Sequence, residues 1–115
     1  YDLLEIQKIR EPGIQIVSNL SVLPVKENYL VYKAARLLQE EFALTDGISV
    51  KLTKRIPVAA GMAGGSTDAA AMLYAMNQLY DLGLSRRELM KRGVQIGADV
   101  PYCLMRGTAL AEGIG

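Results

Sequence analysis

A cluster of glycines followed by two hydroxyl residues is the part of this sequence best suited to chemistry. In the stretch PVAAGMAGGSTDAA, Gly61, Gly64 and Gly65 stand just ahead of Ser66 and Thr67. Glycine has no Cβ, so another group can approach the main chain, and a helix that starts here would present unpaired N–H groups and the positive end of its dipole. The spacing matches neither the P-loop nor the dinucleotide fingerprint. A phosphate-binding loop and a tight turn in which Ser66 merely caps the helix therefore both stay open.

Three charged residues could act on a bound phosphate, and each also has a structural interpretation. Lys54 falls on the inner face of the strand expected just before the glycines, where it could reach a phosphate or extend to water. Asp68, expected in the first turn of the helix, would complement the dipole or, beside phosphates, require Mg²⁺. Asp99 lies in the segment GADVP, whose Val-Pro pair favours extended backbone. It is either a turn former or the base for an attacking hydroxyl.

The elements that must position these residues begin with two strands. Residues 1–9 and 14–17 are rich in apolar side chains and flank a Pro-Gly pair, which predicts two strands joined by a turn. An amphipathic helix follows, with Asn28 as its N-cap. On this helix Tyr29 and Tyr32 are expected to pack, with stacking on a base as the alternative. The apolar stripe of the helix consists of Val31, Ala34, Ala35, Leu38 and Phe42.

The remaining elements place the glycine cluster between a strand and a helix. Residues 48–53 alternate between apolar and polar, and a helix is expected after the glycines. Ser85 opens another helix through the spacing of a capping box, and this helix ends by Gly93 or Gly97. A last strand is expected from Tyr102. This order predicts an α+β (mixed α/β) domain with helices packed on one face of a sheet.

Length and composition restrict the class of protein. The chain has 115 residues, half of them apolar, which suffices for the core of one domain. Thirteen basic against twelve acidic residues, without a basic run, argue against nucleic acid as a partner. No stretch is long and apolar enough for a membrane span. The chain has one cysteine and no histidine, which excludes the usual zinc sites. A single cysteine also fits a reducing, cytoplasmic compartment. Tyr1 and the ending at Gly115 suggest a piece of a longer chain.

Several segments resemble one known enzyme superfamily. IPVAAGMAGGSTDAAA at residues 56–71, IGADVPYC at residues 96–103 and the terminal GTALAEGIG are similar to the GHMP kinases. The glycine loop alone indicates the superfamily, which includes mevalonate, homoserine and galactose kinases. Together with NYLVYKAA, which begins at Asn28, the GADVP segment indicates the narrower family that acts on 4-diphosphocytidyl-2-C-methyl-D-erythritol in non-mevalonate isoprenoid biosynthesis. The N-terminal strands fit this family only loosely.

The resemblance implies an ATP-dependent small-molecule kinase that uses Mg²⁺ to phosphorylate the 2-hydroxyl group of this substrate. The implied fold is the N-terminal domain of a GHMP kinase, similar to the second domain of ribosomal protein S5. Asp99 would be the catalytic base, Asn28 and Lys54 would make further nucleotide contacts, and Ser66 is a candidate Mg²⁺ ligand. The implied ATP loop consists of Pro57, Val58, Ala59, Ala60, Gly61, Met62, Ala63, Gly64, Gly65, Ser66 and Thr67.

The sequence also departs from the family pattern. The family's N-terminal lysine strand, its Gly-Tyr-His segment and its C-terminal domain have no counterpart here, so residues 1–115 are interpreted as a single partial domain and the isolated chain is expected to be inactive.

Two alternatives stay open for the function. One is another GHMP kinase, for mevalonate or homoserine, and the other is a non-catalytic nucleotide-binding or packing module. The sequence predicts no oligomeric state.

Overall fold

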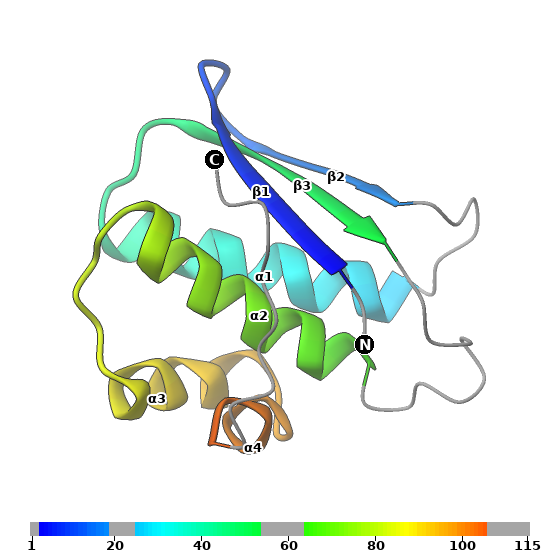
Figure 1. Cartoon of the computed structure of the whole chain (residues 1–115), viewed down its shortest axis with the longest axis vertical. Coiled ribbons are helices and arrows are strands. Elements are labelled where there is room, and N and C mark those ends of the chain that lie inside the picture. The colour runs from blue at the N-terminus through cyan, green and yellow to red at the C-terminus, as the bar shows by residue number, and fades with distance from the viewer. Residues whose placement is uncertain (1–2, 19–24, 54–63, 106–115) are drawn as a thin grey trace.

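A computed structural model describes residues 3–18, 25–53 and 64–105, apart from the side chains of Ser18 and residues 25–28. The described residues form a three-stranded sheet and four helices (Figure 1). In chain order the elements are β1 (Leu3–Ile9), β2 (Ile14–Ser18), α1 (Val25–Glu41), β3 (Gly47–Thr53), α2 (Gly64–Leu79), α3 (Arg86–Ile96) and α4 (Val100–Met105).

The sheet has the order β1-β3-β2, so the third strand in the sequence lies in the centre. β1 runs antiparallel to β3, with Ile6 opposite Val50, and β2 runs parallel to β3, with Ile16 opposite the same valine. The two predicted N-terminal strands are thereby confirmed. They do not pair with each other, because β3 lies between them.

The turn between β1 and β2 fits closely against the start of β3. Gly13 has a φ of +116°, a left-handed conformation that glycine adopts without strain. Its carbonyl oxygen accepts the N–H of Ile48 at 2.9 Å. A Cβ at Gly47 would lie only 1.7 Å from the carbonyl oxygen of Glu11. Glycine at position 47 is therefore required for this approach of two backbones.

The helices cover one face of the sheet, as predicted (Figure 1). α1 and α2 lie directly under the sheet, and α3 and α4 pack on the far side of α2. Along β3, Ile48 and Val50 are fully buried while Lys51 is exposed, because alternate side chains point to opposite faces. The predicted α+β architecture is thus confirmed. The helical side chains in the core include Val31, Ala34, Ala35, Leu38, Ala69, Met72, Leu73 and Met76.

Two helices begin earlier than predicted. α1 begins at Val25, so Asn28 lies inside the first turn and is not the N-cap. α2 begins at Gly64, which puts Asp68 in the second turn. The predicted interaction of Asp68 with the helix dipole is therefore wrong, because that effect falls off within the first turn. Asp68 is instead a buried residue with 2% of its surface exposed.

The predicted capping box at the start of α3 is confirmed. Ser85 Oγ accepts the N–H of Glu88 at 3.2 Å, and the N–H of Ser85 donates to Glu88 Oε1 at 3.0 Å. Hydrogen bonding to the Glu88 carboxyl group, first from the Ser85 backbone and then from the Ser85 side chain, lowers the pKa of this carboxyl group. The helix ends with Gly97 as its C-cap, so the second of the two predicted end points is the right one.

Residues 100–105 form the short helix α4 where a strand from Tyr102 was predicted. Pro101 fits the first turn because the N–H that proline lacks has no helical partner there. Val100, Cys103 and Leu104 are buried at the spacing of one helix face. The strand interpretation overlooked this helical spacing, which begins two residues before the segment that looked extended.

Candidate functional site

The predicted phosphate loop ends in the first turn of α2, whose backbone lies within the described residues. Gly65 is buried, and Ser66 and Thr67 are half-buried. Two hydroxyl groups therefore stand at a helix end whose first N–H groups have no helical partner. The predicted site residues that lie outside the described part of the chain are residues 57–63, Lys54 and the side chain of Asn28.

The first half of α2 is built from small side chains. Ala69, Ala70 and Ala71 are all buried, and larger buried side chains begin only at Met72. Small residues let the backbone of the helix lie close to its neighbours. The start of α2, with its glycines and hydroxyls, is thus held by packing against the core.

A side-chain contact joins the first turn of α2 to α4. Thr67 Oγ1 lies 3.6 Å from Cys103 Sγ, within hydrogen-bond range for sulfur, although the two residues are 36 positions apart. The N–H of Cys103 in turn donates to the carbonyl oxygen of Asp99 at 3.1 Å. The side chain of Asp99 is exposed on the turn before α4. The fold therefore brings two predicted site segments together, the glycine-rich turn and the segment that carries Asp99.

A glycine sets the distance between α3 and α4. A Cβ at Gly93 would lie 2.9 Å from Val100 Cγ1 and 3.4 Å from both Leu104 Cδ1 and Pro101 N. Gly93 was predicted as one possible end of the helix, but it lies inside α3 and permits close packing instead. Because Val100 directly follows Asp99, this contact also fixes the turn on which Asp99 lies.

Arg92 ties α3 to the end of α1. Its Nε donates to Glu41 Oε1 at 2.8 Å, a second N–H donates to the other oxygen of this carboxylate, and Nη1 donates to the carbonyl oxygen of Glu88 at 2.8 Å. The hydrogen bonds to Glu41 raise the pKa of the Arg92 guanidinium group. Sequence reasoning missed this bidentate pair, because its two residues are 51 positions apart and no local pattern connects them.

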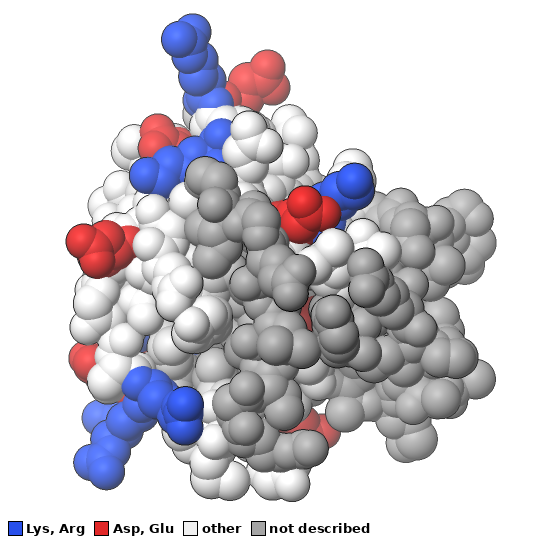
Figure 2. Space-filling model, viewed as in Figure 1, with Lys and Arg blue, Asp and Glu red and all other residues white. Residues whose placement is uncertain are grey.

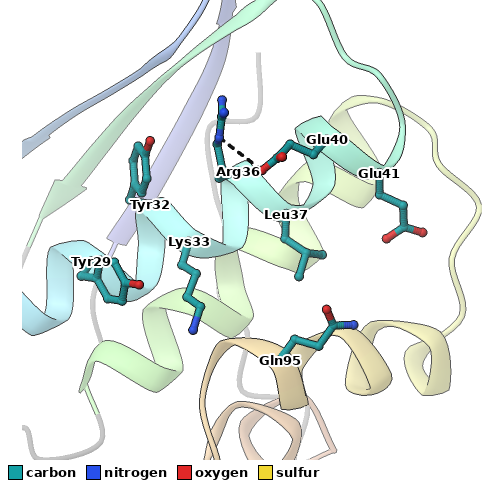
Figure 3. Close-up of a pocket in the computed structure, with 8 residues that line it drawn as sticks. All are labelled: Tyr29, Tyr32, Lys33, Arg36, Leu37, Glu40, Glu41 and Gln95. Carbon is teal, nitrogen blue, oxygen red and sulfur yellow. Dashed lines mark ion pairs between the residues drawn. The ribbon is translucent and has the colours of Figure 1, made fainter.

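A hollow of about 570 Å³ lies between α1 and α3 (Figure 3). Tyr29 is 52% exposed and Tyr32 is 43% exposed, so the prediction that both rings pack in the core is wrong. Lys33 Nζ lies 5.7 Å from the centre of the Tyr29 ring. Arg36 Nε lies 3.3 Å from Glu40 Oε1. Because acidic and basic side chains pair in and around the hollow, it has little net charge to attract phosphate.

The described residues form neither a metal-binding cluster nor a membrane span. No three side chains among His, Cys, Asp and Glu come together there in a way that could hold a metal ion. In the same part of the chain, no helix combines the length and the apolar character that crossing a bilayer requires.

The chain matches a known protein family through most of its length. Residues 29–107 match the family described as GHMP kinases N terminal domain. Because this match covers more than half of the chain, the chain belongs to the GHMP kinases and corresponds to their N-terminal domain.

Individual relatives are similar along the whole chain or nearly so. The 4-diphosphocytidyl-2-C-methyl-D-erythritol kinase of Lachnospira eligens is 61% identical over 115 residues, which make up 40% of that protein. The crystal structure of a 4-(cytidine 5'-diphospho)-2C-methyl-D-erythritol kinase has a TM-score of 0.70 and 32% identity, covering 90% of this chain and 35% of the other.

A more distant neighbour shows the fold alone. The homoserine kinase from Cytophaga hutchinsonii has a TM-score of 0.66 and 23% identity, covering 89% of this chain and 32% of that one. The chain thus spans less than half the length of each of these three proteins.

Proposed function

We propose that the complete gene product phosphorylates the 2-hydroxyl group of 4-diphosphocytidyl-2-C-methyl-D-erythritol with ATP, in non-mevalonate isoprenoid biosynthesis. This chain would supply the ATP-binding part. The observation that carries the proposal is the contact between Thr67 and Cys103, because it joins the glycine-rich turn to the segment that carries Asp99. The 61% identity to the kinase of Lachnospira eligens supports this choice of substrate.

The ATP loop is proposed to run from Pro57 to Thr67. Backbone N–H groups at the start of α2 would hold the phosphates, and Gly65 fits this role because it has no side chain to obstruct the backbone. When bound, the nucleotide would supply the γ-phosphoryl group and Mg²⁺ would neutralise charge on the phosphates. The hydroxyl of Ser66 is the proposed Mg²⁺ ligand. Asn28 and Lys54 are proposed to contact the nucleoside end.

Asp99 is proposed to accept the proton of the attacking hydroxyl group. Its exposed carboxylate is accessible to a substrate arriving from solvent. Its backbone is held by the N–H of Cys103, and the following residue packs against Gly93. A positioned general base of this kind contributes about 10²–10⁴-fold to the rate.

The proposal is tested by measuring ADP release from the complete gene product with three alcohols: 4-diphosphocytidyl-2-C-methyl-D-erythritol, mevalonate and homoserine. We expect turnover with the first alone. Asp99→Asn should lower kcat by about 10²–10⁴-fold while the KM for ATP changes little. Asp81→Asn is the matched control, because Asp81 is also exposed on a turn and its φ of 51° is one that asparagine tolerates.

The outcomes separate the two parts of the proposal. Turnover with mevalonate or homoserine only would refute the substrate, whereas an Asp99→Asn variant with wild-type kcat would refute the role of the base. If Asp99→Asn and Asp81→Asn lose the same amount of activity, the role of Asp99 as the base is also refuted. Such a loss would follow from the removal of any surface carboxylate.

We further propose that the protein acts on small molecules in the cytoplasm. Cys103 is the single cysteine of the sequence and forms no disulfide within the described residues, which fits a reducing compartment. Cell fractionation followed by immunoblotting tests this location, and recovery of the protein from the culture medium would contradict it.

A further inference from the structure

A groove of about 590 Å³ follows the outer face of α3 and ends at the start of α4. It is separate from the first turn of α2 and from the hollow between α1 and α3. Three of its lining residues are basic, here called the rim, and three are apolar, here called the floor. The lining residues are Arg86, Arg87, Met90, Lys91, Val94 and Pro101.

One of the three cations of this groove, Lys91, interacts electrostatically with the carboxylate of Glu88. Arg86, Arg87 and Lys91 are exposed, and none of them forms an ion pair within the described part of the chain. Figure 2 shows basic side chains gathered at the corner of the molecule where Figure 1 places α3. The nearby carboxylates are already engaged, since Glu88 belongs to the capping box and Glu41 binds Arg92. The groove therefore keeps its positive charge although the whole chain has a net charge of only +1.

Two of these cations occupy helix positions that are electrostatically unfavourable for a positive charge. Arg86 and Arg87 are the first two residues of α3, at the positive end of the helix dipole. Charges that violate a local rule without local compensation are typical of surfaces used for binding. The arginines therefore point to a negatively charged ligand for this groove.

The floor of the groove is apolar and partly uncovered. Val94 is 66% exposed, and Met90 and Pro101 are half-buried. Apolar contact area surrounded by arginine, with methionine in it, is the composition of the centre of a protein–protein interface. A ligand that satisfies this groove needs both carboxylates for the rim and apolar side chains for the floor.

We propose that this groove docks an acidic segment of a partner protein, with carboxylates on Arg86, Arg87 and Lys91 and an apolar side chain on Val94. The groove spans residues 86–94 of α3, which is about 12 Å along a helix. This length matches about two helical turns or about four extended residues. Contact over so short a segment indicates transient binding rather than a permanent complex.

Other polyanions fit the groove less well. Nucleic acids are bound chiefly through phosphate contacts, and three cations with an apolar floor supply few of them. An anionic membrane attracts larger basic clusters, of about four to eight Lys or Arg residues, or helices with big apolar side chains. Arginine pairs with carboxylates in a bidentate manner, which favours an acidic peptide.

The experiment uses the complete gene product and a fluorescein-labelled acidic peptide of about twelve residues, in which Glu alternates with pairs of Leu. Binding is followed by fluorescence anisotropy. Arg87→Gln with Lys91→Gln should weaken binding by about tenfold. Arg10→Gln with Lys51→Gln is the matched control, because it removes the same charge from exposed positions outside the groove and should change affinity by less than about twofold.

Further arms distinguish the chemistry of the ligand. Val94→Ser should weaken binding of the peptide, and a peptide with Ser in place of Leu should bind more weakly to the wild type. Kinase turnover should be unchanged in all of these variants. The proposal is overturned if the peptide shows no saturable binding or if both double variants lose affinity equally. It is also overturned if phosphatidylglycerol vesicles or a single-stranded oligonucleotide bind this groove more tightly than the peptide.

Discussion

Replacing Gly93 by alanine tests the close contact between α3 and α4. A new Cβ would lie 2.9 Å from Val100 Cγ1, closer than real Cβ contacts come. Alanine in place of glycine stabilises a helix interior by about 0.5–1 kcal/mol, whereas overpacking a core destabilises by about 1–3 kcal/mol. Val100 is fully buried, and its branched side chain has few other rotamers. We therefore expect the clash to prevail and Gly93→Ala to lower the free energy of unfolding by about 1–2 kcal/mol.

The effect of Gly93→Ala should also be measured in the Val100→Ala variant, which lacks the methyl group that the new Cβ would meet. Alone, this substitution leaves a cavity and lowers the free energy of unfolding by about 2 kcal/mol. Gly93→Ala then fills part of that cavity and should be neutral or stabilising. The double-mutant cycle should give a coupling free energy of about 1–2 kcal/mol. Gly97→Ala is a second control, because its Cβ would lie at an ordinary 3.5 Å from Val100.

Urea unfolding followed by circular dichroism measures these differences, and thermal unfolding checks them, since about 1 kcal/mol shifts the Tm of a small domain by about 4–8 °C. If Gly93→Ala proves as stable as the wild type, or has the same effect in both backgrounds, the proximity of the two helices is refuted. The complete gene product should also lose kcat in this variant if Asp99 is the base, because the turn that carries Asp99 would move with α4.

Three other substitutions test separate contacts. Gly47→Ala would put a Cβ 1.7 Å from the carbonyl oxygen of Glu11, so it should destabilise by about 3 kcal/mol, and a Tm near that of the wild type would contradict this. Tyr80→Phe should stabilise by about 1 kcal/mol, because the buried hydroxyl has no hydrogen-bond partner among the described residues; a loss of stability on urea unfolding would reveal a partner. The lowered pKa of Glu88 means that its carboxylate contributes stability above its ordinary pKa and that this contribution is lost as pH falls through the lowered value. The stability difference between the wild type and Glu88→Gln should therefore be present at about pH 7 and vanish once the pH has fallen through the lowered pKa, and its persistence in stronger acid would be inconsistent with that lowered pKa.

The elements with strong local signals could be predicted, and their arrangement could not. The alternation of Ile48 and Val50 with polar neighbours indicates a half-buried strand, and the capping box at Ser85 marks a helix start, because both effects act within a few residues. The pairing of Ile6 and Ile16 with the same valine on β3 depends on tertiary packing, which no local pattern encodes. The short helix α4 was missed because it has a single turn of apolar spacing and contains a proline.

In the candidate site, too, the features with local signals could be predicted and the contacts between distant segments could not. Gly64, Gly65, Ser66 and Thr67 were correctly placed at a helix start, because backbone freedom is a local property, but α2 begins two residues before Ser66, which is therefore not its cap. The contact of Thr67 with Cys103 joins distant segments and had no signal in the sequence. Gly93 did have a signal in the sequence, since a glycine inside a helical pattern often marks close packing. The same glycine, however, also fits the end of a helix. Only the approach of Val100 distinguishes the two interpretations.

The central position of β3 has a consequence for biosynthesis. Within the described residues, β1 and β2 have β3 as their only neighbour in the sheet, so neither can be completed before residues 47–53 leave the ribosome. At about 5–20 residues per second, the 35 residues between Ser18 and Thr53 delay pairing by about 2–7 s. During that interval the nascent chain carries two apolar strands with free edges, which are prone to aggregate. The N-terminal strands of this protein are thus expected to need protection by a chaperone at the ribosome exit.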